Sequence, residues 1–256
     1  NDDGWTPLLY AAGVGASAEV VSALLKAGAN VEARGANDET PLMMAAAMST
    51  DPEVLLTLIK AGADIEARDK EGGTSLMVAA AYSVTPEVIS TLIVAGADLE
   101  ARDAYEETAL LWAAASNANP EVFSVLIQAG AELEVSGKSG LTPLMSAVKS
   151  NTPEVVAALI KAGADLEARG LQVETALMWA AALSSDLEML SVLIEAGAEL
   201  EVRDVYGSTP LIAAAINNHS AEVLTALIKA GADIEAYAGD GKTPLIAAAA
   251  YNENSP

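Results

Sequence analysis

The apolar positions of the chain follow a pattern that returns about every 34 residues. A Thr that precedes an apolar run recurs at Thr6, Thr40, Thr74, Thr108, Thr142, Thr175, Thr209 and Thr243. Successive Thr residues are 34 positions apart in six cases and 33 apart in one. A period of this length is typical of proteins in which one small unit of structure stacks on the next.

Each period predicts two helices separated by a short turn. Five of the Thr residues are followed by Pro, as in Thr40-Pro41, and Thr caps a helix whose first turn accepts Pro. The second helix follows a residue that favours the cap position, in turn Ser17, Asp51, Thr85, Asn119, Thr152, Asp186 and Ser220. A Gly then marks the expected left-handed helix end, at Gly28, Gly62, Gly96, Gly130, Gly163, Gly197 and Gly231.

One such helix pair cannot bury its own apolar face, whereas a stack of pairs can. The sequence therefore predicts an all-α fold, an α-solenoid of about seven and a half repeats in a single array over residues 1–256. The predicted units lie near 1–34, 35–68, 69–102, 103–136, 137–169, 170–203 and 204–237, followed by a partial unit at 238–256.

Composition narrows the possible functions. The chain has 13 Lys and Arg residues and 36 Asp and Glu residues, which gives a formal net charge of −23. This charge argues against binding to nucleic acid or to anionic lipid, because both need a cationic face. The chain has no Cys and one His, so we expect no thiolate metal site, no Cys nucleophile and no cofactor. No apolar stretch approaches the roughly 18 residues of a membrane span.

The repeated segments resemble the ankyrin repeat family over essentially the whole chain. Matching stretches read Thr6-Pro7-Leu8-Leu9-Tyr10-Ala11-Ala12 and Gly28-Ala29-Asn30-Val31-Glu32-Ala33, and they recur in register. The resemblance implies helix pairs joined by β-hairpin loops, with a concave face formed by the hairpin tips and the first helices. It also implies a protein-binding role.

The chain departs from the family pattern in two ways that bear on the loops. Residues such as Met43 and Met77 stand where the family usually has a His that hydrogen-bonds to the loops. The Gly two residues before the cap Thr is replaced by Asp38, Glu106 and Val173 in three units, which leaves the tip geometry open there.

The charged residues fall into two sets. Twenty acids occupy repeating positions, and with Arg34, Arg68, Arg102, Arg169 and Arg203 they predict ladders of partly paired surface charges. Twelve further acids lie in the tip segments, namely Asp2, Asp3, Asp38, Glu39, Asp69, Glu71, Asp103, Glu106, Glu107, Glu174, Asp204 and Asp240. Neighbouring acids such as Glu106 and Glu107 lack the burial that acid–base catalysis needs, so we predict no catalytic residue.

The candidate partner-binding residues combine apolar side chains with tip acids. They are Trp5, Glu39, Met48, Tyr82, Tyr105, Glu107, Trp112, Leu141, Lys149, Leu171, Trp179, Leu183 and Tyr206. Lys149 stands where most units have Ala or Gly, and it would be one central cation in an apolar groove with an acidic rim. In an alternative interpretation, Trp112 and Trp179 fill gaps between repeats instead.

The sequence is compatible with three functional hypotheses. The leading one is a non-catalytic protein–protein interaction module, a monomer that binds a partner with a basic surface in its concave groove. The second is a substrate-recruiting array of a larger enzyme or effector. The third is a structural or engineered scaffold without a ligand.

Overall fold

A computed structural model describes residues 5–183, 187–218 and 220–252 of the chain, and over these residues it is all-helical, with fifteen helices and no strand. The chain divides into two compact units, Asn1–Lys138 and Ser139–Pro256. Each unit is a stack of helix pairs, as the repeat predicts.

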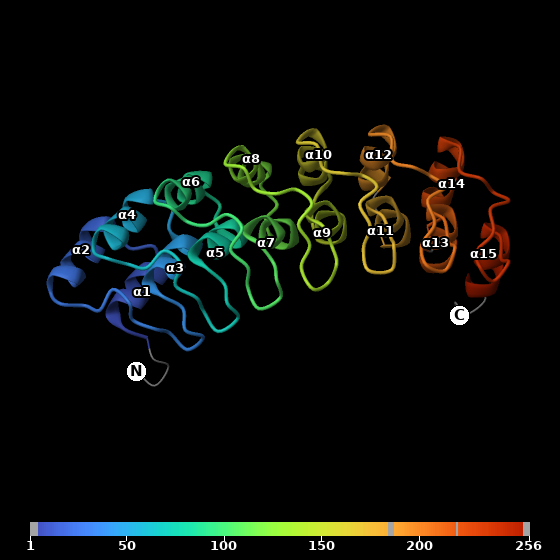
Figure 1. Ribbon diagram of the computed structural model, residues 1–256. Helices are drawn as coiled ribbons and strands as arrows, with labels where there is room; N and C mark the ends of the chain where they lie inside the picture. The colour runs from blue at the N-terminus through green and yellow to red at the C-terminus, as the bar shows by residue number, and fades with distance from the viewer. Residues whose placement is uncertain (1–4, 184–186, 219, 253–256) are drawn as a thin grey trace. The chain divides into compact units, whose positions relative to one another are not determined.

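In the first unit, the helices form two rows (Figure 1). The inner row holds the helices that follow the repeating Thr, which are α1 (Pro7–Gly13), α3 (Pro41–Met48), α5 (Ser75–Tyr82) and α7 (Ala109–Ser116). The outer row holds α2 (Ala18–Lys26), α4 (Pro52–Lys60), α6 (Pro86–Val94) and α8 (Pro120–Gln128). Each helix contacts its partner in the pair and its neighbours in its own row.

The second unit repeats this arrangement. Its inner helices are α9 (Pro143–Ser150), α11 (Ala176–Leu183), α13 (Pro210–Asn217) and α15 (Pro244–Asn252). Its outer helices are α10 (Pro153–Lys161), α12 (Leu187–Glu195) and α14 (Ala221–Ala230).

The core lies between the two rows in each unit. Ala45 and Ala46 of α3 are fully buried, and such small side chains let neighbouring inner helices approach closely. Leu55 and Leu58 of α4 are also fully buried, so the outer helix supplies the larger apolar groups. Burial of each such Leu contributes roughly 1.5–3 kcal/mol to stability. Phe123 of α8 belongs to this core.

The predicted helix caps are largely confirmed. The hydroxyl oxygens of Thr6, Thr40, Thr74, Thr142, Thr175, Thr209 and Thr243 each accept the backbone N–H three residues later. Thr108 is the exception, because its buried hydroxyl has no partner. Of the second-helix caps, Asp51, Asn119 and Ser220 accept a backbone N–H, whereas Ser17, Thr85 and Thr152 make no such bond. The predicted cap Asp186 lies outside the described residues.

A five-residue tip loop precedes the Thr cap of an inner helix. Six of the described tip loops lie within one unit, namely 35–39, 69–73 and 103–107 in the first, and 170–174, 204–208 and 238–242 in the second. In each, the N–H of the first residue donates to the carbonyl of the fifth, at 2.9–3.1 Å. Neighbouring loops are also joined, since Lys70 N donates to Asn37 O and Ala104 N donates to Glu71 O.

The fourth residue of every described tip loop has a positive φ angle, whichever residue stands there. Asp38, Glu106 and Val173 adopt φ values of 61°, 63° and 68°, close to the 75–84° of Gly72, Gly207 and Gly241. The tip geometry that the sequence left open is therefore the same in all these loops, and the three non-glycine residues adopt a disfavoured conformation to keep it.

The prediction that the repeating Arg residues pair with acids is wrong for all of them except Arg34. Each of Arg34, Arg68, Arg102, Arg169 and Arg203 donates from Nη1 to two backbone carbonyls, one on the tip loop that follows it and one 34 residues later. Among the described Arg residues, only Arg34 also lies within ion-pair distance of an acid, at 3.9 Å from Glu32. One guanidinium nitrogen of each Arg thus ties successive repeats together through their backbones.

The repeating acids bind backbone groups too. Glu32, Glu66 and Glu100 accept the N–H of the residue 32 positions later, at 2.8–2.9 Å, and Glu167 and Glu201 do the same in the second unit. The ladders predicted from the sequence are therefore carboxylate–amide and guanidinium–carbonyl ladders. Such charge-assisted hydrogen bonds are roughly twice as strong as hydrogen bonds between neutral groups.

Candidate functional site

The first unit has a groove of about 730 Å³ between its tip loops and its inner helices. We name it the first groove. Its apolar lining comes from α3, α5 and α7, and consists of Met43, Met44, Ala47, Met48, Val78, Tyr82 and Trp112. Its polar lining comes from tip loops 35–39 and 69–73, and consists of Asn37, Glu39, Asp69, Lys70 and Glu71.

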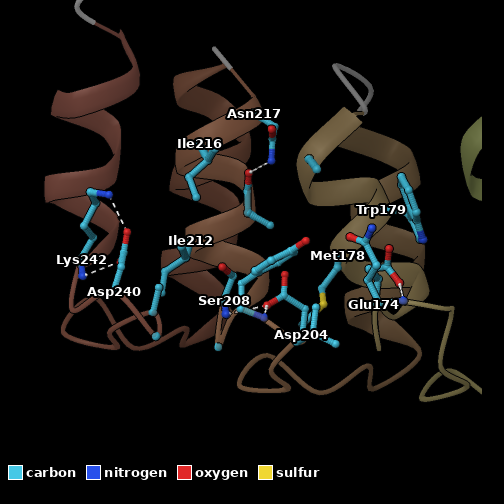
Figure 2. Close-up of a pocket in the computed structure, with 18 residues that line it drawn as sticks. Glu174, Met178, Trp179, Asp204, Ser208, Ile212, Ile216, Asn217, Asp240 and Lys242 are labelled. Atoms are coloured by element: carbon cyan, nitrogen blue, oxygen red, sulfur yellow. Dashed lines mark hydrogen bonds and ion pairs between the residues drawn. The ribbon is translucent and has the colours of Figure 1, made fainter.

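The second unit has a groove in the equivalent place, of about 750 Å³, which we name the second groove (Figure 2). Its apolar side includes Met178 and Trp179 of α11 and Ile212 and Ile216 of α13. Loop residues close its other side, among them Glu174, Asp204, Tyr206, Asp240 and Lys242. The carboxylate of Asp240 pairs with the ammonium of Lys242 at 2.5 Å, as Figure 2 shows.

A smaller cavity of about 210 Å³ lies beside the second groove. The sequence-predicted residues Leu141, Lys149, Leu171 and Trp179 line it, together with Ser139, Gln172 and Glu174. The ammonium of Lys149 sits 4.2 Å from the centre of the Trp179 ring, a cation–π contact between α9 and α11. The cation predicted for the groove is therefore held on an indole face.

Most of the predicted partner-binding residues line one of these spaces. Glu39, Met48, Tyr82 and Trp112 line the first groove, and Trp179 and Tyr206 line the second. Of these, Met48, Tyr82 and Tyr206 are 58%, 58% and 64% exposed. Trp112 and Trp179 are half-buried, so each both packs against its surroundings and lines a groove.

Four of the predicted residues line none of the three spaces. Trp5 is half-buried close to Gly13, while Tyr105 and Leu183 are exposed. Glu107 is half-buried, with its Cγ close to Gly137.

Sequence reasoning missed several lining residues, notably Met44, Val78 and Ile212. Met44 and Val78 occupy the fourth position after the repeating Thr, the same position as Trp112 and Trp179. That shared position is the signal that identifies Met44 and Val78 as lining residues, although neither is aromatic.

The tip acids do more than create a negative rim. Oδ1 of Asp69, Asp103 and Asp204 accepts two backbone N–H groups of the same loop, at 2.7–2.9 Å. Oδ2 of Asp103 also accepts the indole N–H of Trp112, at 2.9 Å. These carboxylates brace the loops that form the groove rims.

In tip loops 35–39 and 170–174 the first position is Gly, and a Glu at the fifth position supplies the brace. Oε2 of Glu39 accepts Asn37 N, and Oε2 of Glu174 accepts Gln172 N, at 2.9 and 2.8 Å. A Cβ on Gly35 or Gly170 would lie 2.8 Å from the Oε2 atom of that Glu. The Gly therefore makes room for the Glu carboxylate.

Tip loop 103–107 has an acid at its first position, Asp103, and another at its fifth position, Glu107. Asp103 braces the loop, and Glu107 has no hydrogen bond or ion pair to the described residues through its side chain. Burial raises the pKa of Glu107, and the nearby Asp103 carboxylate raises it further. Burial acts in the same direction on Glu39, but hydrogen bonds from Asn37 and the Glu39 backbone, with a contribution from Lys70, lower the pKa of Glu39 overall.

Comparison with known proteins agrees with this geometry. A family model described as ankyrin repeats, in three copies, matches residues 1–69, 73–170 and 177–255. The chain belongs to the ankyrin repeat family. Ankyrin repeat domains are protein–protein interaction modules without catalytic activity of their own.

A similar solved structure is the ankyrin repeat domain of Bcl-3, described as a unique member of the IκB protein family. It aligns with a TM-score of 0.71 and 28% sequence identity, over 89% of this chain and 99% of that one. A search of curated protein sequences gave no match.

Within residues 5–183, 187–218 and 220–252, no helix is both long and apolar enough to cross a membrane. Among the same residues, no group of three or more His, Asp or Glu side chains is placed to hold a metal ion.

Proposed function

We propose that this ankyrin repeat chain is a non-catalytic module that binds a protein partner with a basic surface. The partner lies on the face made by the inner helices and the tip loops, and the chain acts as a monomer. The observation that carries this proposal is the pair of grooves, one in each unit, with apolar inner-helix lining and acidic loop residues.

The chemistry of the grooves supports binding rather than catalysis. In the second groove the three acids Glu174, Asp204 and Asp240 are engaged with loop amides or with Lys242. A general acid or base needs a free group with a suitably shifted pKa beside the reacting atoms. These carboxylates instead hold the loops in place and contribute negative charge.

Site-specific photo-crosslinking tests where a partner binds. Proteins captured with the chain as bait are identified by mass spectrometry, and the purified partner is then mixed with chains that carry benzoylphenylalanine at single positions. Tyr82 and Tyr206 report on the two grooves. Val94 of α6 and Tyr237 are exposed positions that line neither groove.

We expect crosslinks from position 82, position 206 or both, and none from positions 94 and 237. Crosslinking confined to positions 94 or 237 would place the partner on another face and contradict the proposal. Turnover of a substrate by the purified chain would contradict its non-catalytic part.

A further inference from the structure

The first groove carries its charge and its apolar surface at opposite ends of the same helices. Glu39, Asp69 and Glu71 lie on the tip loops that precede α3 and α5. Met48 and Tyr82 are the last residues of α3 and α5. An eight-residue helix is roughly 12 Å long, so the acidic edge and the apolar edge are separated by about that distance.

The apolar edge offers an adaptable surface rather than a set of hydrogen-bonding groups. Met48 and Tyr82 are both more than half exposed, and Met44 and Val78 beside them are half-buried. The indole N–H of Trp112 is already donated to Asp103. Thioether side chains adjust to apolar groups of different shapes, so this edge suits a bulky apolar side chain without demanding one in particular.

The acidic edge keeps an excess of negative charge. Three carboxylates face one ammonium, that of Lys70, which donates to the carbonyl of Ala36. Glu39 and Asp69 are fixed in position by loop amides. The carboxylate of Glu71 is exposed and has no hydrogen bond or ion pair to the described residues. Two negative charges thus remain uncompensated, and Glu71 is available to an incoming cation.

We propose that the first groove binds a peptide segment with two different edges, Lys or Arg side chains toward tip loops 35–39 and 69–73 and bulky apolar side chains toward Met48 and Tyr82. This inference rests on the proposed function and specifies its ligand. Charge complementarity selects the basic edge, since an acidic segment would meet Glu71 and Glu39 at close range. Apolar burial against the helix ends supplies most of the affinity.

A random peptide library tests the inference without knowledge of the natural partner. Phage-displayed random 12-residue peptides are selected on the whole chain, and the most enriched sequence is synthesised with a fluorescent label for anisotropy measurements. We expect enriched peptides to carry a net positive charge and at least one large apolar residue. Enrichment of neutral or acidic peptides would overturn the inference.

Variants then locate the peptide. The double variant Met48→Ala with Tyr82→Ala is expected to weaken binding about 30-fold, because interface energy concentrates in a few large side chains. Glu71→Gln is expected to weaken it about two- to fivefold, as for a single exposed ion pair. Tyr237→Ala and Glu195→Gln are matched controls, since both residues are exposed and line neither groove, and they should leave binding unchanged.

Thermal unfolding of each variant shows whether the fold is kept, and Glu71→Gln alters only an exposed side chain. Unchanged binding by both Glu71→Gln and the double variant would overturn the inference. If the peptides instead lose affinity on Tyr206→Ala, the first groove is the wrong site but the proposed function stands. If no peptide is enriched, the inference is overturned, and the crosslinking experiment with a captured partner decides the proposed function separately.

Discussion

Val173 shows how strongly the tip loop constrains a single residue. Its φ of 68° is a conformation that β-branched residues rarely adopt, yet the loop is closed by the same backbone hydrogen bonds as its neighbours. The left-handed conformation costs a non-glycine residue roughly 1–2 kcal/mol. The surrounding repeats therefore impose the geometry on a residue that disfavours it.

Replacement of this residue by Gly should stabilise the protein. We expect Val173→Gly to raise the free energy of unfolding by about 1 kcal/mol in urea titrations, because relief of the backbone strain exceeds the extra flexibility of Gly in the unfolded chain. Asp38→Gly is the matched control and should gain less, since Asp tolerates this conformation better than Val. A loss of stability in Val173→Gly would show that side-chain packing outweighs the strain.

Glu39 and Glu107 occupy the same loop position but should respond to pH in opposite ways. The pKa of Glu107 is raised by burial and by Asp103, so its contribution to stability falls as pH rises above the ordinary Glu value of 4.5. The pKa of Glu39 is lowered overall, although burial opposes this, because Asn37 and its own backbone donate hydrogen bonds to its carboxylate. Its contribution is present above pH 4.5 and is lost as pH falls through the lowered value.

At pH 7 we therefore expect Glu107→Gln to stabilise the chain and Glu39→Gln to destabilise it, each by a few tenths of a kcal/mol, because both side chains are only half-buried and solvent screens the effect. Both differences should vanish at a pH well below 4.5, where the carboxyl groups are protonated. Urea unfolding at pH 7 and at acidic pH measures this. Two differences of the same sign at pH 7 would contradict the assignment of Asp103 as the brace in tip loop 103–107.

The inner helices differ in how they begin. Thr40 caps α3 through a 3.2 Å hydrogen bond from Met43 N, whereas the hydroxyl of Thr108 at α7 is buried without a partner. Both residues are 1% exposed. A Thr at the same repeat position thus caps the helix through its hydroxyl in one repeat, whereas in another its hydroxyl has no hydrogen-bond partner.

Valine, which has nearly the same shape as threonine, distinguishes the two positions. We expect Thr40→Val to lower the free energy of unfolding by about 1 kcal/mol, the usual cost of a lost cap. Thr108→Val should be neutral or slightly stabilising, because it removes a buried polar group that has no partner. Equal losses in the two variants would show that the Thr108 hydroxyl finds a partner in solution.

The net charge of the whole chain affects the rate at which a charged partner associates with it. The formal net charge of −23 includes acids on the rims of both grooves. Long-range attraction speeds the association of oppositely charged molecules and is screened within about 10 Å at 0.1 M salt.

We expect the on-rate of a basic peptide to fall at least about tenfold between 20 mM and 500 mM NaCl, with a much smaller change in the off-rate. Surface plasmon resonance measures both rates, and a neutral peptide of the same length is the control. An on-rate that does not depend on salt would contradict the charge argument, as would tight binding to duplex DNA.

The sequence by itself determined the repeat, the helix pairs, most of the caps and the left-handed Gly at each helix end. These features depend on residues a few positions apart, such as Thr40 and Met43, so local preference is enough to predict them. The four aromatic residues that line the two grooves, Tyr82, Trp112, Trp179 and Tyr206, could also be predicted, because they stand at fixed distances from the repeating Thr.

Only the tertiary structure decided what the charged residues do. Arg68 binds a carbonyl 34 residues away, and Glu66 binds an amide 32 residues away, and the sequence pattern cannot tell such bonds from ion pairs between neighbours. The unpaired state of Glu107 likewise depends on Asp103 already filling the loop. Periodicity fixes which residues share a position, but the partner of each polar atom depends on distances that exist only once the repeats are stacked.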